Sequence, residues 1–379
     1  MKILHIADTH LGYSAYRKVN EDGINQREID TYDGFKQFVD YAIKSKPDMI
    51  LHAGDLFDSV RPNNRAITFA MQQILRLSKQ GIPLVIIAGN HEHPKLKETG
   101  HIFSIFDHIE HVYPVYHEKY EKHVFEIQGK KVAIHALPQT VTKREFNENL
   151  KKLKKKQDSD YNIVLAHGGV SGIKVFTMND FNEQIIPEEY LKTDFDYMAL
   201  GHYHKYTKVA GNAFYAGSTE YFTFTEAGEQ KGFIEITLNG KKLKPGFVPL
   251  ELRSMIDTKP VNCLILSLDD VMKKIKEIII EVKPNGKIFR ITLDNIPAHI
   301  YRGVDFGSIR EWSKDALHYE IKANIVREGE SKPSETSKID ALSREFNKYM
   351  IDLDIKEKNV LLKLGNEYIQ KVIEKDEVR

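Results

Sequence analysis

Cysteine is almost absent from this chain of 379 residues, since Cys263 is the single one. An intramolecular disulfide is therefore excluded, and so is a structural zinc site built from several thiolates. A reducing, intracellular environment is the expectation for such a composition, and we predict a cytoplasmic or nucleoid location.

Long apolar stretches and an excess of one charge are also missing. No apolar run approaches the ~20 residues that span a bilayer. The first apolar segment meets Asp8 after a few residues and lacks the form of a signal peptide, so we expect no membrane association. Lys and Arg number 55 and Asp and Glu 54, which gives a net charge of +1. Any phosphate-binding surface must therefore be a local patch.

The length and the 41% of apolar residues predict a globular protein of two or three domains. We place a first domain at 1–250, where strand and helix patterns alternate, and a small α+β domain at 251–330. A polar stretch at 331–338 is typical of a linker. Two apolar helical patterns at 339–379 either fold back on the chain or bind another protein, and we favour the second.

Five apolar, β-favouring segments are each followed at once by residues that bind metals. This repeated pattern is the most informative feature of the sequence, because ligands in α/β proteins bind at the carboxyl ends of strands. The residues that follow the five segments are, in chain order, Asp8 and His10, Asp55, Asn90 and His91, His167, and His202 and His204. We predict that they converge and that Asp55 lies at their common focus and bridges two metal ions. Mixed oxygen and imidazole ligands suit Mn²⁺, Fe²⁺ or Zn²⁺ better than Ca²⁺ or Mg²⁺.

The remaining patterns predict a two-sheet α/β sandwich flanked by helices. Helices are expected over Asp30–Lys44, Arg65–Lys79 and Thr99–His108, and from about Lys143 through the lysine run that ends at Lys156. A hairpin is expected over Val124–His135. Phe214–Ser218 and Gly232–Leu238 are expected to join a second sheet. In the second domain we expect a helix over Val271–Val282 and a strand over Lys287–Leu293.

Taken together, the five motifs resemble those of the calcineurin-like metallophosphoesterases, over roughly the first 240 residues. The residues around these motifs resemble those of one branch, the meiotic-recombination-eleven / SbcD family. This family supplies the nuclease subunit of a DNA double-strand-break repair complex. The segments that carry this closer resemblance are Asp8-Thr9-His10-Leu11-Gly12, Gly54-Asp55-Leu56-Phe57, Arg61-Pro62, Ala199 to Lys205 and Tyr215 to Ser218.

The resemblance implies a particular use of each ligand. One metal would be held by Asp8, His10, Asp55 and His204. The other would be held by Asp55, Asn90, His167 and His202. His91 would be catalytic, stabilising the pentacoordinate phosphorus or protonating the leaving oxygen. The cofactor expected is two Mn²⁺ per chain, with Fe²⁺ or Zn²⁺ as alternatives.

The same resemblance implies a manganese-dependent nuclease with 3′-to-5′ exonuclease action on duplex DNA and endonuclease action on single strands. The domain at 251–330 would cap the core and help hold DNA. The terminal helices would bind a coiled-coil ATPase of the ABC/SMC type. A homodimer, formed through helices near Arg65–Lys79 and Thr99–His108, would make a heterotetramer with that ATPase. The candidate DNA contacts are Tyr13, Arg17, Asp58, Arg61, Asn63 and Lys205.

One residue departs from the family pattern. Many members carry histidine three residues after the bridging aspartate, whereas this chain carries Asp58. A carboxylate there would repel a phosphate unless it turns away or pairs with a cation such as Arg61. Two other functions remain open: a phosphatase for small molecules or phosphoproteins, and a non-catalytic scaffold. The phosphatase has no use for the last ~130 residues, and the scaffold is disfavoured because every ligand position is filled.

Overall fold

The computed structural model describes residues 1–379 except 95, 97–98, 155–157, 172–183, 193–194, 241, 327–345, 347–349, 351–357, 359–360 and 367–379. The chain folds into two compact units. The first comprises Met1–Lys259, Lys276–Ile291 and Gly307–Ile321, and the second comprises Pro260–Ile275, Thr292–Phe306 and the described residues from Lys322 onward. Among the described helices, none is long and apolar enough to cross a membrane.

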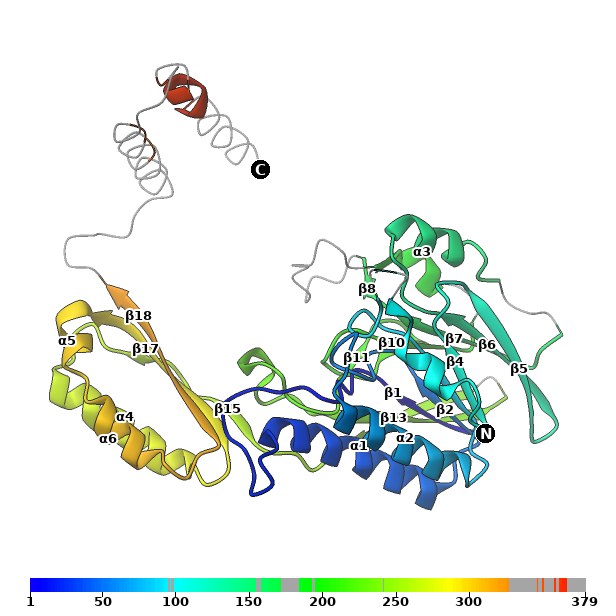
Figure 1. The fold of residues 1–379 in the computed structure, drawn as a ribbon, viewed down its shortest axis with the longest axis horizontal. Coiled ribbons are helices and arrows are strands. Elements are labelled where there is room, and N and C mark those ends of the chain that lie inside the picture. Colours follow the sequence, from blue (N-terminus) through cyan, green and yellow to red (C-terminus); the bar gives the residue numbers. More distant parts are fainter. Residues whose placement is uncertain are drawn as a thin grey trace. The chain divides into compact units, whose positions relative to one another are not determined.

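Two six-stranded sheets form the core of the first unit (Figure 1). The first sheet has the order β14 (Lys242–Pro249), β13 (Gly232–Asn239), β1 (Lys2–Ile6), β2 (Met49–His52), β3 (Leu84–Ile87) and β4 (Val112–Val115). The second sheet has the order β11 (Thr207–Lys208), β12 (Ala213–Tyr215), β10 (Tyr197–Gly201), β7 (Tyr161–His167), β6 (Lys130–Leu137) and β5 (Glu121–Ile127).

Helices cover the outer face of each sheet, so the predicted α/β sandwich is confirmed. The helices α1 (Gln26–Ser45) and α2 (Asn64–Ser78) pack side by side on the first sheet (Figure 1). The helix α3 (Lys143–Leu150) and the 3₁₀ turn η3 (Glu188–Lys192) lie over the second. A separate apolar layer fills the space between the sheets. Because both faces of the central strands are buried, these strands are apolar without alternation.

Parallel pairing brings the ligand-bearing strand ends to the same edge. β1, β2 and β3 run parallel, with Ile6 opposite His52 at the end of the first pair. β7 and β10 also run parallel, and their last pair is Gly201 opposite His167. Parallel strands carry their carboxyl ends to one side of a sheet, so the residues that follow these strands meet there.

Three expectations about elements were wrong in detail. Gly232–Leu238 joins the first sheet as β13, antiparallel to β1, because it covers the edge that β2 leaves free. The expected helix at Thr99–His108 is a short 3₁₀ helix, η2 (Ile102–Phe106), in which Phe103 and Phe106 are both buried. A spacing of three residues suits a 3₁₀ turn, where i and i+3 eclipse. The helix α3 ends at Leu150, before the lysine run, whose like charges would repel along a helix.

The chain beyond β14 forms a small α+β arrangement. Its sheet has the order β15 (Met255–Asp257), β17 (Ile288–Pro297) and β16 (Val261–Asn262), and β18 (His318–Val326) pairs with β17. The helices are α4 (Leu268–Val282), α5 (Ala298–Gly303) and α6 (Phe306–Trp312). The expected helix at Val271–Val282 and strand at Lys287–Leu293 are therefore confirmed. The predicted linker at 331–338 and most of the helical pair at 339–379 lie outside the described residues.

Candidate metal centre

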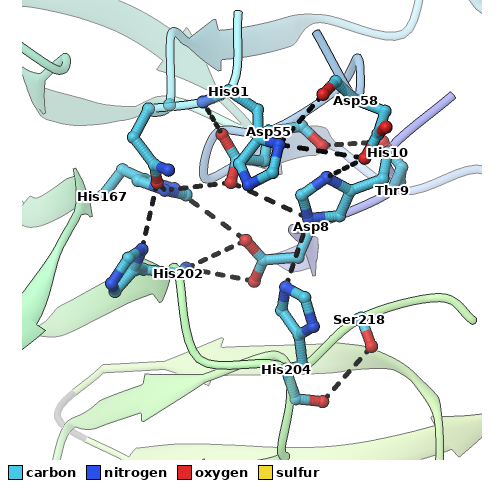
Figure 2. A network of polar contacts seen from close by, with 12 residues as sticks. Asp8, Thr9, His10, Asp55, Asp58, His91, His167, His202, His204 and Ser218 are labelled. Atoms are coloured by element: carbon cyan, nitrogen blue, oxygen red, sulfur yellow. Dashed lines mark hydrogen bonds and ion pairs between the residues drawn. The ribbon is translucent and has the colours of Figure 1, made fainter. Parts of the chain in front are cut away.

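The side chains predicted as metal ligands lie together at the carboxyl ends of the central strands (Figure 2). Asp8 and His10 follow β1, Asp55 follows β2, and Asn90 follows β3. From the second sheet, His167 ends β7, and His202 and His204 follow β10. The cluster therefore draws on both sheets, with Asp55 and Asp8 buried at its base.

Several ligands are held in a backbone conformation that non-glycine residues seldom adopt. The φ angles of Asp8, His10 and Asp55 are 51°, 46° and 55°, and that of His202 is 108°. Such strain persists only where the surroundings impose it, and it gathers at functional sites. Hydrogen bonds between the loops impose it here: the N–H groups of Asp8 and His10 donate to the carbonyls of Gly54 and Asp55 at 3.0 Å each.

Two glycines let the strand ends approach closely enough for a shared cluster. Gly54 has φ 94°, and a Cβ at this position would overlap the imidazole of His167. A Cβ at Gly89 would overlap the carboxylate of Asp55. The glycines that precede the ligands are thus required by close packing of backbone against ligand side chains.

His10 and His204 face each other through their Nε2 atoms, at a distance where either one ring donates a hydrogen bond to the other or both lone pairs meet a cation. Their Nε2 atoms are 3.2 Å apart. The opposite nitrogen, Nδ1, lies 3.3 Å from Asp58 Oδ1 in His10 and 3.3 Å from Glu226 Oε1 in His204. A carboxylate beside Nδ1 favours the tautomer with the proton on Nδ1, which directs both Nε2 lone pairs into the same space.

His167 shows the same requirement on the other side of Asp55. Its Nδ1 donates to the carbonyl of Ala53 at 2.8 Å, so Nε2 faces Asn90 Oδ1 at 2.8 Å and Asp55 Oδ2 at 3.4 Å. Nε2 needs either a proton or a metal ion to meet these oxygens. Burial opposes charge on both groups, but the Asp55 carboxylate raises the pKa of His167 to about 9. His167 and His10 in turn lower the pKa of Asp55 well below its usual value, against the effect of burial.

The donor set therefore fits divalent cations. Among the described residues, three groups bring ligand atoms within 4.8 Å of one another: Asp8 with His10 and His204, Asp8 with Asp55 and His167, and His10 with Asp55 and His91. Asn90 Oδ1 also lies 3.1 Å from His202 Nδ1. Buried carboxylates and imidazoles that converge in this way are typical of a metal centre.

His91 lies at the open side of the cluster. Its backbone N–H donates to Asp55 Oδ1 at 2.9 Å, and its Nδ1 donates to the carbonyl of Asp58 at 3.0 Å. The ring packs edge-on against His10 with centroids 4.5 Å apart, and 42% of the side chain is exposed. His91 is thus oriented by its neighbours while remaining accessible to a substrate.

The residues predicted to contact DNA differ in their surroundings. Arg17 and Arg61 are exposed. Tyr13 donates to the carbonyl of Phe222 at 3.2 Å, and Lys205 Nζ lies 3.4 Å from Glu229. The side chain of Asn63 caps α2 by accepting from the N–H of Ala66 at 2.8 Å. Asp58 is the only one of the set that joins the metal cluster, through His10 and His91.

Sequence reasoning missed three residues that support the cluster. Glu92 is fully buried and accepts from the N–H groups of Gly89 and Leu56 at 3.0 and 3.3 Å, which ties together the loops after β2 and β3. Burial and the charge of Asp55 raise its pKa well above the usual value. Its place directly after His91 was the available signal.

Glu226 and Lys231 are the other two, and they form an ion pair of 2.7 Å. Lys231 also donates to the carbonyl of His204 at 2.7 Å. Burial opposes the charge of Glu226, but His204 and Lys231 lower its pKa to about 2. The residues lie more than twenty positions after His204, in and behind the short 3₁₀ helix η4 (Phe224–Glu226), and no local pattern indicates them.

The sandwich and the carboxylates and imidazoles that converge at its strand ends are those of a metallophosphoesterase. The family model described as calcineurin-like phosphoesterase matches residues 1–206, and the chain belongs to this family.

Curated relatives narrow the similarity to one branch. The chain is 33% identical over 242 residues to the DNA double-strand break repair protein Mre11 of Methanococcus maripaludis. The matched region covers 61% of this chain and 60% of that protein. The Mre11 protein of Methanocaldococcus jannaschii is 33% identical over 261 residues, 64% of each chain. That of Sulfurisphaera tokodaii is 28% identical over 348 residues, 87% of this chain and 82% of the relative. The match thus spans less than two thirds of the length of the first two relatives. The similarity to these Mre11 proteins confirms the predicted resemblance to the meiotic-recombination-eleven / SbcD family.

Proposed function

We propose that this protein is a manganese-dependent DNA nuclease that acts on double-strand breaks and hydrolyses phosphodiesters with two metal ions. The observation that carries the proposal is the 3.2 Å approach of His10 Nε2 to His204 Nε2 beside the buried Asp8 and Asp55. Fe²⁺ and Zn²⁺ are the alternative metals that this donor set would accept.

Each ligand has a proposed place. Asp8, His10, Asp55 and His204 would hold one metal, which we call the first metal site. Asp55, Asn90, His167 and His202 would hold the other, the second metal site. When bound, the two cations activate a water for in-line attack on phosphorus and take up charge on the phosphoryl oxygens. His91, with Nδ1 donating to Asp58, presents Nε2 to the substrate, where it stabilises the pentacoordinate phosphorus or protonates the leaving oxygen.

DNA is the proposed substrate because the curated relatives are named as DNA double-strand break repair proteins. The exposed Arg17 and Arg61 and the half-buried Tyr13, near the metal ligands in sequence, are proposed phosphate and sugar contacts. Lys205, Asn63 and Asp58 complete the proposed set. The proposed actions are 3′-to-5′ exonuclease on duplex ends and endonuclease on single strands. The part of the chain at 251–330 is proposed to cap the core and hold DNA.

An assay on contrasting substrates tests this proposal. With Mn²⁺, we expect cleavage of linear duplex, hairpin and single-stranded DNA, and EDTA should abolish it. A p-nitrophenyl phosphate monoester should be hydrolysed more slowly than a p-nitrophenyl phosphodiester, because a nuclease centre is built for a phosphate with two ester bonds. The favoured alternative is a general phosphatase, and rapid monoester hydrolysis without DNA cleavage would establish it. A scaffold would leave every substrate intact.

A partner is proposed for the terminal segment. The resemblance implies a coiled-coil ATPase of the ABC/SMC type, bound through the helical pair at 339–379, in a heterotetramer around a homodimer of this chain. In that segment the described side chains of Leu361 and Leu364 are 44% and 49% exposed. Removing residues 333–379 should leave Mn²⁺-dependent DNA cleavage intact and abolish co-purification with the ATPase. A truncated chain that still binds the ATPase would contradict the docking role.

A further inference from the structure

Both histidines of the first metal site have a carboxylate behind them. Asp58 Oδ1 lies 3.3 Å from His10 Nδ1, and Glu226 Oε1 lies 3.3 Å from His204 Nδ1 (the His10–Asp58 pair is seen in Figure 2). The two carboxylates come from separate segments, the loop after β2 and the short helix η4. They serve the two rings whose Nε2 atoms approach each other at 3.2 Å.

We propose that Asp58 and Glu226 are positioning residues that raise the affinity of the first metal site. Glu226 Oε1 is hydrogen-bonded to His204 Nδ1, which keeps the proton on that nitrogen and directs the Nε2 lone pair into the cluster. Asp58 lies 3.3 Å from His10 Nδ1 without hydrogen-bond geometry and acts through its charge. Each carboxylate thus adds a negative charge behind its histidine. Carboxylates placed in this way make an imidazole a stronger ligand. The inference rests on the proposed two-metal centre and assigns Asp58 a role that a DNA contact would not need.

Asp58 and Glu226 each contact a histidine of the first metal site, whereas His167 of the second site is oriented by a different group. His167 Nδ1 donates to the neutral carbonyl of Ala53 at 2.8 Å, and Asn90 contributes a neutral amide oxygen. Removing the charge of Asp58 or Glu226 should therefore weaken one metal site and spare the other. This asymmetry distinguishes a positioning role from a general effect on stability.

Glu226 is held more firmly than Asp58. Its Oε2 lies 2.7 Å from Lys231 Nζ, and its Oε1 accepts from the hydroxyl of Thr223 at 3.2 Å. The Glu226 side chain is 10% exposed and the Asp58 side chain 31%. Because solvent screens an exposed charge more strongly, loss of the Glu226 carboxylate should have the larger effect.

The test is a Mn²⁺ titration of the full-length, metal-free protein, read by calorimetry and by the electron paramagnetic resonance signal of free Mn²⁺. Wild type should show two binding events. Glu226→Gln should weaken one of them by about 10–100-fold, and Asp58→Asn should weaken the same event by a smaller factor. Both substitutions keep an amide oxygen near Nδ1, so the change removes charge while retaining shape.

Glu229→Gln is the matched control, because Glu229 contacts the same lysine, Lys231, at 3.2 Å, whereas the carboxylate 3.3 Å from His204 Nδ1 is that of Glu226. It should leave both binding events unchanged. Wild-type affinity in both Glu226→Gln and Asp58→Asn would overturn the inference, as would equal weakening of both events. Asp58→Asn is independent of Lys231 and decides the matter should Glu226→Gln fail to fold. A wild type that binds fewer than two Mn²⁺ would instead contradict the proposed two-metal function.

Discussion

Asp55→Asn is expected to lower the rate of Mn²⁺-dependent cleavage of linear DNA by more than about 100-fold. This loss exceeds the effect usually seen when a residue that only hydrogen-bonds to a metal ligand is replaced. Asp55 is the proposed shared ligand, and its charge lowers the repulsion between two cations that it would hold together. Asparagine tolerates the positive φ of 55° at this position, so the backbone can stay as it is. Its amide oxygen can still accept the N–H of His91, which now donates to Asp55 Oδ1 at 2.9 Å.

The measurement pairs the rate of DNA cleavage with the Mn²⁺ bound per chain. We expect the variant to bind less than the wild type while its far-ultraviolet circular dichroism is unchanged. Asp48→Asn is a suitable control, because Asp48 precedes the same strand and accepts from the N–H of Lys2 at 2.7 Å, remote from the ligands in the fold. Cleavage that survives in Asp55→Asn would refute the shared-ligand mechanism.

The second large effect is expected at His91, where asparagine should slow turnover by about 10²–10⁴-fold, the usual contribution of a general acid or base. The Nδ1–H of His91 is held by the Asp58 carbonyl, which leaves Nε2 for the substrate. The proposed ligand sets do not include this side chain. Bound Mn²⁺ should therefore remain near two per chain.

Mn²⁺ stoichiometry and single-turnover cleavage of linear DNA measure the two consequences separately. His117→Asn serves as the control, since His117 is an exposed histidine outside the cluster. Loss of one Mn²⁺ together with activity would mean that His91 is a ligand, a reading that its proximity to His10 and Asp55 makes worth testing. Unchanged turnover would remove His91 from the mechanism.

The parts of this fold that could be predicted from sequence are those coded by neighbouring residues. Continuous apolar runs predict strands that are buried on both faces. The strands at the positions of these runs are β1, β2, β3, β7 and β10. The periodic apolar residues of α2 similarly predict its bounds to within a residue. α1 begins four residues earlier than expected, at Gln26, because Asn25 caps it and the buried Arg27 pairs with Asp30 and Glu220. Charged groups buried by long-range pairing leave no periodic signal.

Sheet membership could not be predicted in the same way. The residues of β13 themselves predict a strand. Its pairing with β1, however, places Leu4 opposite Glu235, which is far away in the sequence. Hydrogen bonding between strands depends on which edges remain open after the other strands have paired. Nothing within the segment itself carries that information.

The sequence alone determined which residues could bind metal and that they would meet, because each follows a strand that must end at the same edge of a sheet. It also predicts that Asp55 is the shared ligand of the proposed centre. Only the tertiary structure decided what stands behind those ligands. Asp58, predicted near DNA, lies against His10, and Glu226 with Lys231 holds His204 from a distant segment. The reason is physical: a ligand follows from local chain chemistry, whereas the partner that orients it is chosen by packing between segments far apart in sequence.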